Sequence, residues 1–193
     1  MNQTPHLLEV INTRRSIRDF KEGDIPQTDI ERILEAGIMA PSPGNRQPWR
    51  FHVMQDKVKK KFVETLEQMK NTPWFWQIIV TSAETVPIVI AVENPLVVLR
   101  RTNKETLDNL SLMSVGTLLG TAASIENMLL AIHALGYGST WLSFPTILDA
   151  AKEVTEIRGD LIAVLPVGRP AEVQHDYVDR TRVPVKEVTT FYH

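Results

Sequence analysis

The spacing of apolar residues along the chain switches several times between a helical and a strand period. Apolar positions at i, i+3, i+4, i+7 and i+8 predict a helix that begins near Pro26 and ends before Pro41. A shorter apolar stripe predicts a first helix that ends near Arg14. Similar stripes predict a charged helix at about 58–70 and another helix at about 145–157. Helices therefore account for much of the predicted structure.

Four segments show strand patterns instead. Residues 49–54 alternate apolar and polar side chains, which predicts a half-buried strand. Residues 86–92 and 161–167 are almost continuously apolar, which is typical of strands that are covered on both faces. A short strand is predicted at 139–142. Because the helices and strands do not alternate regularly, their order favours an α+β fold.

The longest helical pattern covers residues 110–135 and is apolar around most of the helix circumference. At 1.5 Å per residue it spans about 39 Å. Gly116 and Gly120 lie one turn apart within it, which predicts close packing against another helix. Gly136 stands where a glycine C-cap is expected. A helix of this composition needs a partner that buries its apolar surface.

Length and composition bound the possible functions. The 193 residues suit one domain spanning 1–193, in which residues from about 169 to 193 form an extended arm. With 21 basic and 23 acidic residues the net charge is -2, which argues against nucleic acid or a membrane as a partner. The absence of cysteine excludes disulfides, thiolate metal sites and cysteine nucleophiles. No signal sequence begins the chain, so we expect a cytoplasmic protein.

Few sequence patterns point to chemistry. The histidines lack the close pairing used for zinc, and we expect His133, within the long helix, to be a packed or capped residue. No nucleophile elbow, P-loop or complete dinucleotide fingerprint is present. We therefore expect neither a metal site nor a catalytic nucleophile, and any redox chemistry needs a bound cofactor.

Arginines form the clearest candidate for a binding site. Arg14, Arg15 and Arg18 surround Ser16, and Arg180 and Arg182 follow much later in the tail. An arginine offers two parallel charge-assisted hydrogen bonds to phosphate oxygens, so these side chains and the hydroxyl could hold a phosphate dianion. The competing interpretation is a solvated, charged surface.

Four motifs, in order along the chain, resemble those of the nitroreductase family of flavoproteins. Residues 14–20 (RRSIRDF) resemble the family's RRSxRxF opening, and residues 41–49 (PSPGNRQPW) resemble its proline-rich loop. Residues 134–141 (ALGYGSTW) and 165–170 (LPVGRP) are similar to two further family segments. The resemblance spans nearly the whole chain and implies an α+β fold with a central, mostly antiparallel sheet flanked by helices. It also implies an intertwined homodimer with two FMN molecules at the interface.

The resemblance assigns residues to the cofactor one by one. It implies that Arg14, Arg15 and Ser16 bind the FMN phosphate and ribityl chain, that Arg18 supports the pyrimidine edge of the ring electrostatically, and that the tail arm embraces the partner subunit. The complete set of implied FMN-binding residues is Arg14, Arg15, Ser16, Arg18, Pro41, Ser42, Pro43, Asn45, Asn71, Trp141, Leu142, Ser143, Arg180 and Arg182. Among these, residues 41–45 would reach the flavin of the other subunit, and the backbone N–H groups of residues 141–143 would face the ring. Asn71 is equally consistent with a helix C-cap.

The implied reaction uses NADH or NADPH as reductant and a small-molecule electron acceptor, such as a nitroaromatic or a quinone, in two half-reactions at one site. Phe144 stands where many relatives have glycine, so it is expected to narrow the approach to the ring. Two alternatives stay open. One is a specialised enzyme of the same fold, either a reductive dehalogenase or an FMN-cleaving enzyme, with residues 93–108 as its lid. The other is a flavin-binding or sensing protein without turnover.

Overall fold

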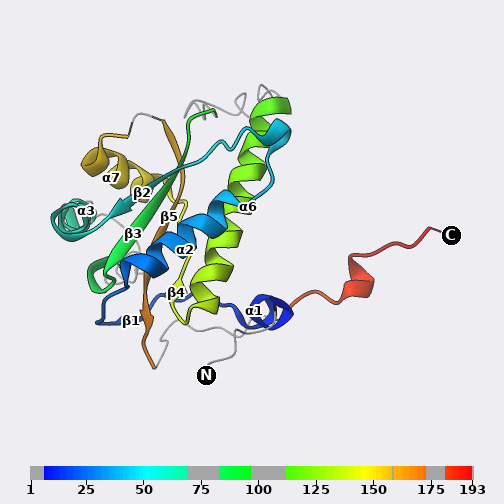
Figure 1. Cartoon of the computed structure of the whole chain (residues 1–193), viewed down its shortest axis with the longest axis horizontal. Coiled ribbons are helices and arrows are strands. Elements are labelled where there is room, and N and C mark those ends of the chain that lie inside the picture. The colour runs from blue at the N-terminus through cyan, green and yellow to red at the C-terminus, as the bar shows by residue number, and fades with distance from the viewer. Residues whose placement is uncertain (1–6, 69–82, 97–111, 158, 173–180, 193) are drawn as a thin grey trace.

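The computed structural model describes residues 7–68, 83–96, 112–157, 159–172 and 181–192. An antiparallel sheet of five strands lies at its centre (Figure 1), in the order β1-β5-β3-β2, with β4 also paired to β5. Its strands are β1 (Phe20–Lys21), β2 (Arg50–Met54), β3 (Ile88–Asn94), β4 (Gly138–Ser139) and β5 (Asp160–Pro170). Every pairing among these strands is antiparallel. The predicted α+β fold with an antiparallel sheet is therefore confirmed.

Helices cover both faces of the sheet. The described helices are α1 (Leu7–Thr13), α2 (Gln27–Ile38), α3 (Asp56–Gln68), α6 (Leu112–Ala134) and α7 (Pro145–Thr155), with 3-10 turns at Pro43–Asn45 and Val185–Glu187. Helices α3 and α7 pack together on one face, while α2 and α6 pack together on the other (Figure 1). Helix α1 lies beside the C-terminal end of α6 (Figure 1). The result is a three-layer arrangement around one sheet.

Strands β3 and β5 form the centre of the core because their apolar side chains alternate between the two helical layers. Val89 and Ala91 belong to the cluster that includes α3 and α7, whereas Ile88 and Ile90 belong to the cluster that includes α2 and α6. All four residues are at most 1% exposed. This burial on both faces explains why the segment reads as a continuous apolar run rather than as an alternating one.

Several boundaries differ from the sequence-based expectations. Strand β1 was not expected, because two residues are too few to show a period. The expected strand at 139–142 is reduced to Gly138–Ser139 and a separate bridge between Leu142 and Val164. Gly136 takes φ +82°, which fits the expected C-cap. The long helix ends at Ala134 as expected within a residue.

Among the described residues, the two glycines of α6 meet the proline-rich loop with its 3-10 turn rather than another α-helix, which corrects that expectation. A Cβ atom on Gly116 would lie 2.9 Å from the ring of Pro43, and one on Gly120 would lie 3.2 Å from the carbonyl oxygen of Pro41. The missing side chains therefore let the proline-rich loop, rather than a helix, rest on the N-terminal half of α6. This contact fixes the loop relative to the rest of the fold.

Much of α6 remains uncovered. By length and composition alone it could cross a membrane, and 44% of its most apolar window is buried within the chain. Seven of its incompletely buried positions recur at alternating steps of four and three and so share one face: Leu112, Gly116, Leu119, Ala123, Glu126, Leu130 and His133. We call these residues the α6 stripe. Only Glu126 and His133 in the stripe are polar.

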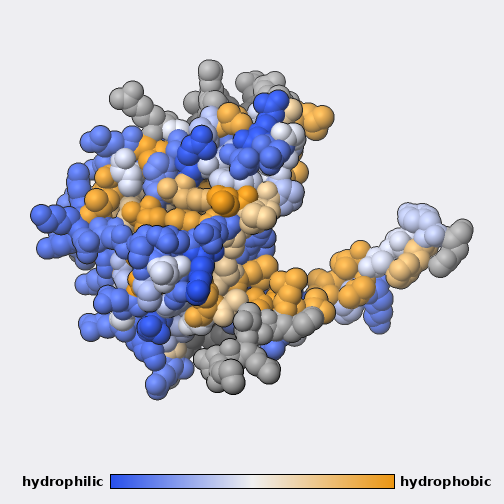
Figure 2. Space-filling view, viewed as in Figure 1, coloured by the Kyte–Doolittle hydropathy of each residue, from blue (hydrophilic) through white to orange (hydrophobic). Residues whose placement is uncertain are grey.

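Apolar residues are also exposed on the tail. Residues 181–192 extend away from the sheet (Figure 1), and Figure 2 shows orange, apolar surface along them. Val183, Val185, Val188 and Phe191 are each at least 60% exposed. An isolated chain would thus leave two apolar surfaces in water, the α6 stripe and the tail.

Candidate functional site

Residues 14–18, which we call the arginine segment, are held at both ends by backbone hydrogen bonds. Arg14 continues the last turn of α1, since its N–H donates to the Val10 carbonyl at 3.0 Å. Three residues later the N–H of Ile17 donates to the Ser139 carbonyl at 2.9 Å, which ties the segment to β4. Gly138 allows this approach, because a Cβ atom there would lie only 2.8 Å from Ile17. The sequence thus places Arg14 and Arg15 against the turn that follows α6.

A small cavity lies at this junction. Its volume is about 10 Å³, comparable to that of one water probe. The lining residues come from the arginine segment, the last turns of α6 and the following turn: Arg14, Arg15, Leu129, Ile132, His133, Tyr137, Gly138 and Ser139. Ser139 is 4% exposed, and its hydroxyl has no hydrogen-bond partner within the described part of the chain. A buried hydroxyl without a partner beside two arginines is suited to bind an anion.

The interactions that Arg14 and Arg15 make within the chain differ in strength. Arg14 approaches Glu126 of α6 at 3.6 Å, and the two side chains are 23% and 48% exposed. Such a long, partly solvated ion pair contributes little, so an incoming anion could replace the carboxylate. Arg15 donates from Nη1 to the carbonyl oxygens of Asn12 and Arg14, both at 2.8 Å. Arg15 therefore also caps the C-terminal end of α1.

His133, expected to be packed or capped, is partly buried, lines the cavity and contacts α1. Its Nε2 lies 2.9 Å from the Thr13 hydroxyl, and that hydroxyl donates to the Glu9 carbonyl. Burial is the main cause that lowers the pKa of His133, and the positive charges of Arg14 and Arg15 lower it further. The imidazole is therefore neutral at neutral pH in the protein without ligand.

Tyr137 anchors the turn below the cavity. Its hydroxyl donates to Asp29 of α2 at 2.8 Å, and the Arg169 guanidinium lies 5.5 Å from its ring centroid. Burial raises the pKa of Tyr137, and the hydrogen bond to Asp29 raises it further. The residue stays protonated and holds the turn in place. Neither Tyr137 nor Ser139 was singled out from the sequence, although both lie in the ALGYGSTW motif.

The proline-rich loop is held in an unusual backbone conformation. Gly44, Asn45 and Gln47 have φ values of 57°, 52° and 47°, in the left-handed region. The Ser42 hydroxyl accepts a hydrogen bond from the Gln47 N–H at 2.9 Å and thereby closes the loop. Strained conformations of this kind persist where the surroundings fix them, and they are common at ligand sites. Pro41 and Asn45 are exposed at the loop surface.

Within one chain, the two halves of the expected site are separated. The loop rests on Gly116 and Gly120, whereas the arginine cavity is lined by His133 at the other end of α6. Seventeen residues separate Gly116 from His133, which corresponds to about 25 Å along the helix axis. One chain therefore does not bring the loop and the arginines to a common ligand.

Of the three backbone donors expected at 141–143, that of Leu142 is already used within the chain. The N–H of Leu142 donates to the Val164 carbonyl at 3.1 Å, so the expectation that it faces a ligand is corrected. Successive N–H groups of an extended segment point to opposite sides, so those of Trp141 and Ser143 point away from β5. The Ser143 hydroxyl is engaged too: it accepts from the Trp141 indole at 2.6 Å and donates to the Ile162 carbonyl. Phe144 is 45% exposed beside these donors.

None of the remaining expected residues that the structure describes lines the cavity. Ser16 is exposed and Arg18 is half-buried, and neither lines the cavity. Arg182 is exposed in the tail. Asn71, Arg180 and residues 97–108 of the expected lid lie outside the described residues.

Comparison with known proteins settles the relationship of this chain. A model of the nitroreductase family matches residues 11–169. The chain belongs to the nitroreductase family. The match contains the arginine segment, the proline-rich loop and the cavity. The tail arginines Arg180 and Arg182 lie beyond it.

Individual members of the nitroreductase family are also similar over most of their length. A protein from Archaeoglobus fulgidus, provisionally named NADH dehydrogenase/NAD(P)H nitroreductase, is 31% identical over 175 residues, which cover 88% of each chain. An iodotyrosine dehalogenase 1 homolog from Caenorhabditis elegans is 25% identical over 95% of this chain and 60% of its own. A provisionally named nitroreductase from Desulfovibrio desulfuricans, solved in complex with FMN, is 26% identical with a TM-score of 0.69, covering 100% of this chain and 99% of its own.

Proposed function

We propose that this nitroreductase-family protein is an FMN-dependent oxidoreductase that takes two electrons from NADH or NADPH and passes them to an electrophilic acceptor such as a nitroaromatic or a quinone. The observation that carries the proposal is the family match over residues 11–169, which includes both the arginine segment and the proline-rich loop. The FMN complex of the Desulfovibrio desulfuricans relative and the name of the Archaeoglobus fulgidus relative support the cofactor and the reductant.

The polar groups around the cavity match the charge of the FMN phosphate, and because the cavity holds only about one water, the phosphate would bind at its opening. A phosphate dianion needs cations and hydrogen-bond donors, and the cavity offers Arg14, Arg15 and the unpartnered hydroxyl of Ser139. Because the ion pair between Glu126 and Arg14 is weak, the phosphate dianion would replace Glu126 as the partner of Arg14. We propose that Ser16, Arg180 and Arg182 add further donors to the same phosphate.

The chemistry that bound FMN supplies is reversible two-electron transfer between a nicotinamide and an acceptor. The chain's own contribution is to position and polarise. We propose that the N–H groups of Trp141 and Ser143 donate to the ring and that Arg18 stabilises negative charge on it. Phe144 would limit which acceptors can stack there. We also propose that Asn71 contacts the flavin.

A homodimer would complete the site. If two copies pair antiparallel along the α6 stripe with a two-fold axis near Ala123, residues near Gly116 of one copy lie opposite residues near Leu130 of the other. This pairing would carry the loop across the separation of about 25 Å to the arginines of the second chain. Pro41, Ser42, Pro43 and Asn45 of the partner subunit would then reach the ligand. The same interface buries the apolar stripe, and the exposed tail would cover the partner.

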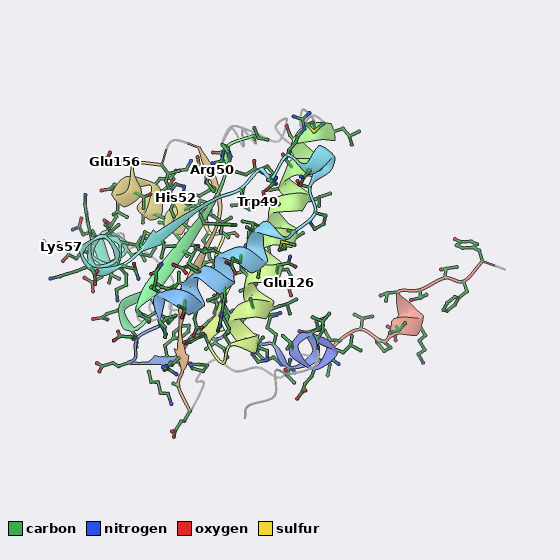
Figure 3. All side chains as sticks on the ribbon, in the orientation of Figure 1. Trp49, Arg50, His52, Lys57, Glu126 and Glu156 are labelled. Atoms are coloured by element: carbon green, nitrogen blue, oxygen red, sulfur yellow. The ribbon has the colours of Figure 1, made fainter. Side chains whose placement is uncertain are left out.

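Purification of the untagged chain tests the proposal. We expect a yellow protein with a bound flavin that is released as FMN on denaturation, and that oxidises NADH or NADPH only with an acceptor present. Arg14→Ala should lose the flavin, whereas the matched control Arg50→Ala, an exposed arginine on β2 (Figure 3), should retain it. A chain that stays colourless with added FMN would refute the proposal. Bound flavin that no nicotinamide reduces would instead favour a sensing role.

A reductive dehalogenase is the second candidate, because a dehalogenase homolog matches 95% of the chain. An acceptor panel separates the candidates. Nitroaromatics and quinones should be reduced faster than halogenated phenols if the first proposal holds. Release of halide at a rate above that of nitroaromatic reduction would favour the second.

A further inference from the structure

The hydrogen bonds around His133 determine where its proton lies. The Thr13 hydroxyl has one proton, which it donates to the Glu9 carbonyl, so it can only accept from the imidazole. His133 therefore donates from Nε2 to Thr13 in its neutral form. The nitrogen that can gain a proton is Nδ1. The hydrogen bond thus fixes one tautomer in the ligand-free protein.

On the side of His133 that lines the cavity, where an anion would bind, the charged side chains are mainly positive. Arg14 and Arg15 line the same cavity as His133, and both lower its pKa after the larger effect of burial. Glu126 lies two turns earlier on the same face of α6 and already pairs with Arg14. Charged and titratable groups on the elements packed around His133 include Glu9 of α1, Arg14, Arg15, Glu126 of α6 and Tyr137, and behind Tyr137 lie Asp29 of α2 and Arg169 of β5. Tyr137 stays protonated because its pKa is raised.

We propose that His133 is a proton-accepting partner of the anion site, so that binding of a phosphate group beside Arg14 and Arg15 takes up a proton from water at His133 Nδ1. This inference rests on the proposed function, in which the anion is the FMN phosphate. A dianion offsets the two guanidinium charges that now oppose protonation of the ring. By linkage, a protonated His133 then binds the anion more tightly.

A change in the pH dependence of FMN affinity is the expected consequence. One proton taken up on binding makes the affinity rise by up to about tenfold for each pH unit of acidification. The phosphate itself loses charge near pH 6, which works in the opposite direction. His133→Gln isolates the histidine, because glutamine keeps an N–H donor for Thr13 but does not titrate. His52→Gln is the matched control, since His52 pairs with Glu93 on the β2–β3 pair, away from the cavity (Figure 3).

Calorimetry of FMN binding to the flavin-free protein, in buffers with different ionisation enthalpies, counts the protons directly. We expect uptake in the wild type and in His52→Gln, and reduced uptake in His133→Gln. Riboflavin, which lacks the phosphate, should show no such difference between the variants. Equal proton uptake by wild type and His133→Gln would overturn the proposal.

NMR titration of the imidazole signals keeps this test separate from the proposed function. The midpoint of His133 should move to higher pH when FMN or excess inorganic phosphate is added. If FMN does not bind, the proposed function fails, and inorganic phosphate alone decides the role of His133. A His133 midpoint that neither anion moves would overturn the inference.

Discussion

The α6 stripe permits a quantitative test of the dimer through one substitution, Leu119→Asp. Leu119 is 64% exposed in the single chain, so about two thirds of its side chain remains to be buried by a partner. Burying a whole leucine side chain contributes about 1.5–3 kcal/mol, which gives about 1–2 kcal/mol for this fraction. A two-fold dimer contains the substitution twice, so the apolar loss is about 2–4 kcal/mol. The dimer Kd should therefore rise by about 30- to 1,000-fold.

Sedimentation velocity over a range of concentrations, with circular dichroism as a check on folding, measures this change. Val58→Asp is the matched control, because Val58 is a partly exposed apolar residue on α3, in the layer opposite α6. It should leave the dimer intact. Leu119→Asp should also lower flavin content, because the loop would no longer reach the second chain's arginines. A wild-type chain that sediments as a monomer, or a Leu119→Asp variant that remains a dimer with wild-type affinity, would refute the reasoning.

Three further substitutions test the packing below the cavity, each by urea unfolding of the flavin-free protein. Tyr137→Phe should cost about 1.5 kcal/mol or more because a carboxylate loses its hydroxyl donor, whereas Tyr192→Phe, at a 93% exposed position, should cost almost nothing. Gly138→Ala should cost about 1–3 kcal/mol, since its Cβ would lie 2.8 Å from Ile17; an unchanged midpoint would contradict this. His133 has a lowered pKa in the folded state, so unfolding takes up protons and stability should fall as the pH drops below about 6.5, but less steeply in His133→Gln.

The sequence patterns predicted those helices and strands that are long enough to show a hydrophobic period. Helix α2 repeats its buried positions at helical spacing over two turns, and the first five residues of β3 are all apolar because both faces of the strand are covered. Strand β1 has only two residues, and its pairing with β5 depends on positions about 150 residues apart. Neither propensity nor periodicity could indicate it. The glycine pair of α6 predicted a close contact correctly, but not that a loop would make it.

Within the site, sequence motifs indicated segments more reliably than individual atoms. The motif at 134–141 located the turn, yet the unpartnered Ser139 hydroxyl and the His133–Thr13 bond depend on contacts between residues far apart in the chain. Leu142 also shows that the motifs do not identify individual hydrogen-bond donors. The family resemblance of residues 141–143 suggested a donor to the ligand, but the alternation of an extended segment turns the Leu142 N–H toward Val164.

The separation of the two half-sites along α6 gives the apolar helix a functional explanation. A helix that exposes an apolar stripe could be covered by lipid or by protein, and its composition alone does not distinguish these. The stripe, however, carries Glu126 beside Arg14 and His133 beside the cavity, and hydrocarbon would leave such groups poorly solvated. A second copy would instead place a polar loop next to them. Burial of the stripe and completion of the ligand site would then be one event, so the dimer and flavin content should be lost together.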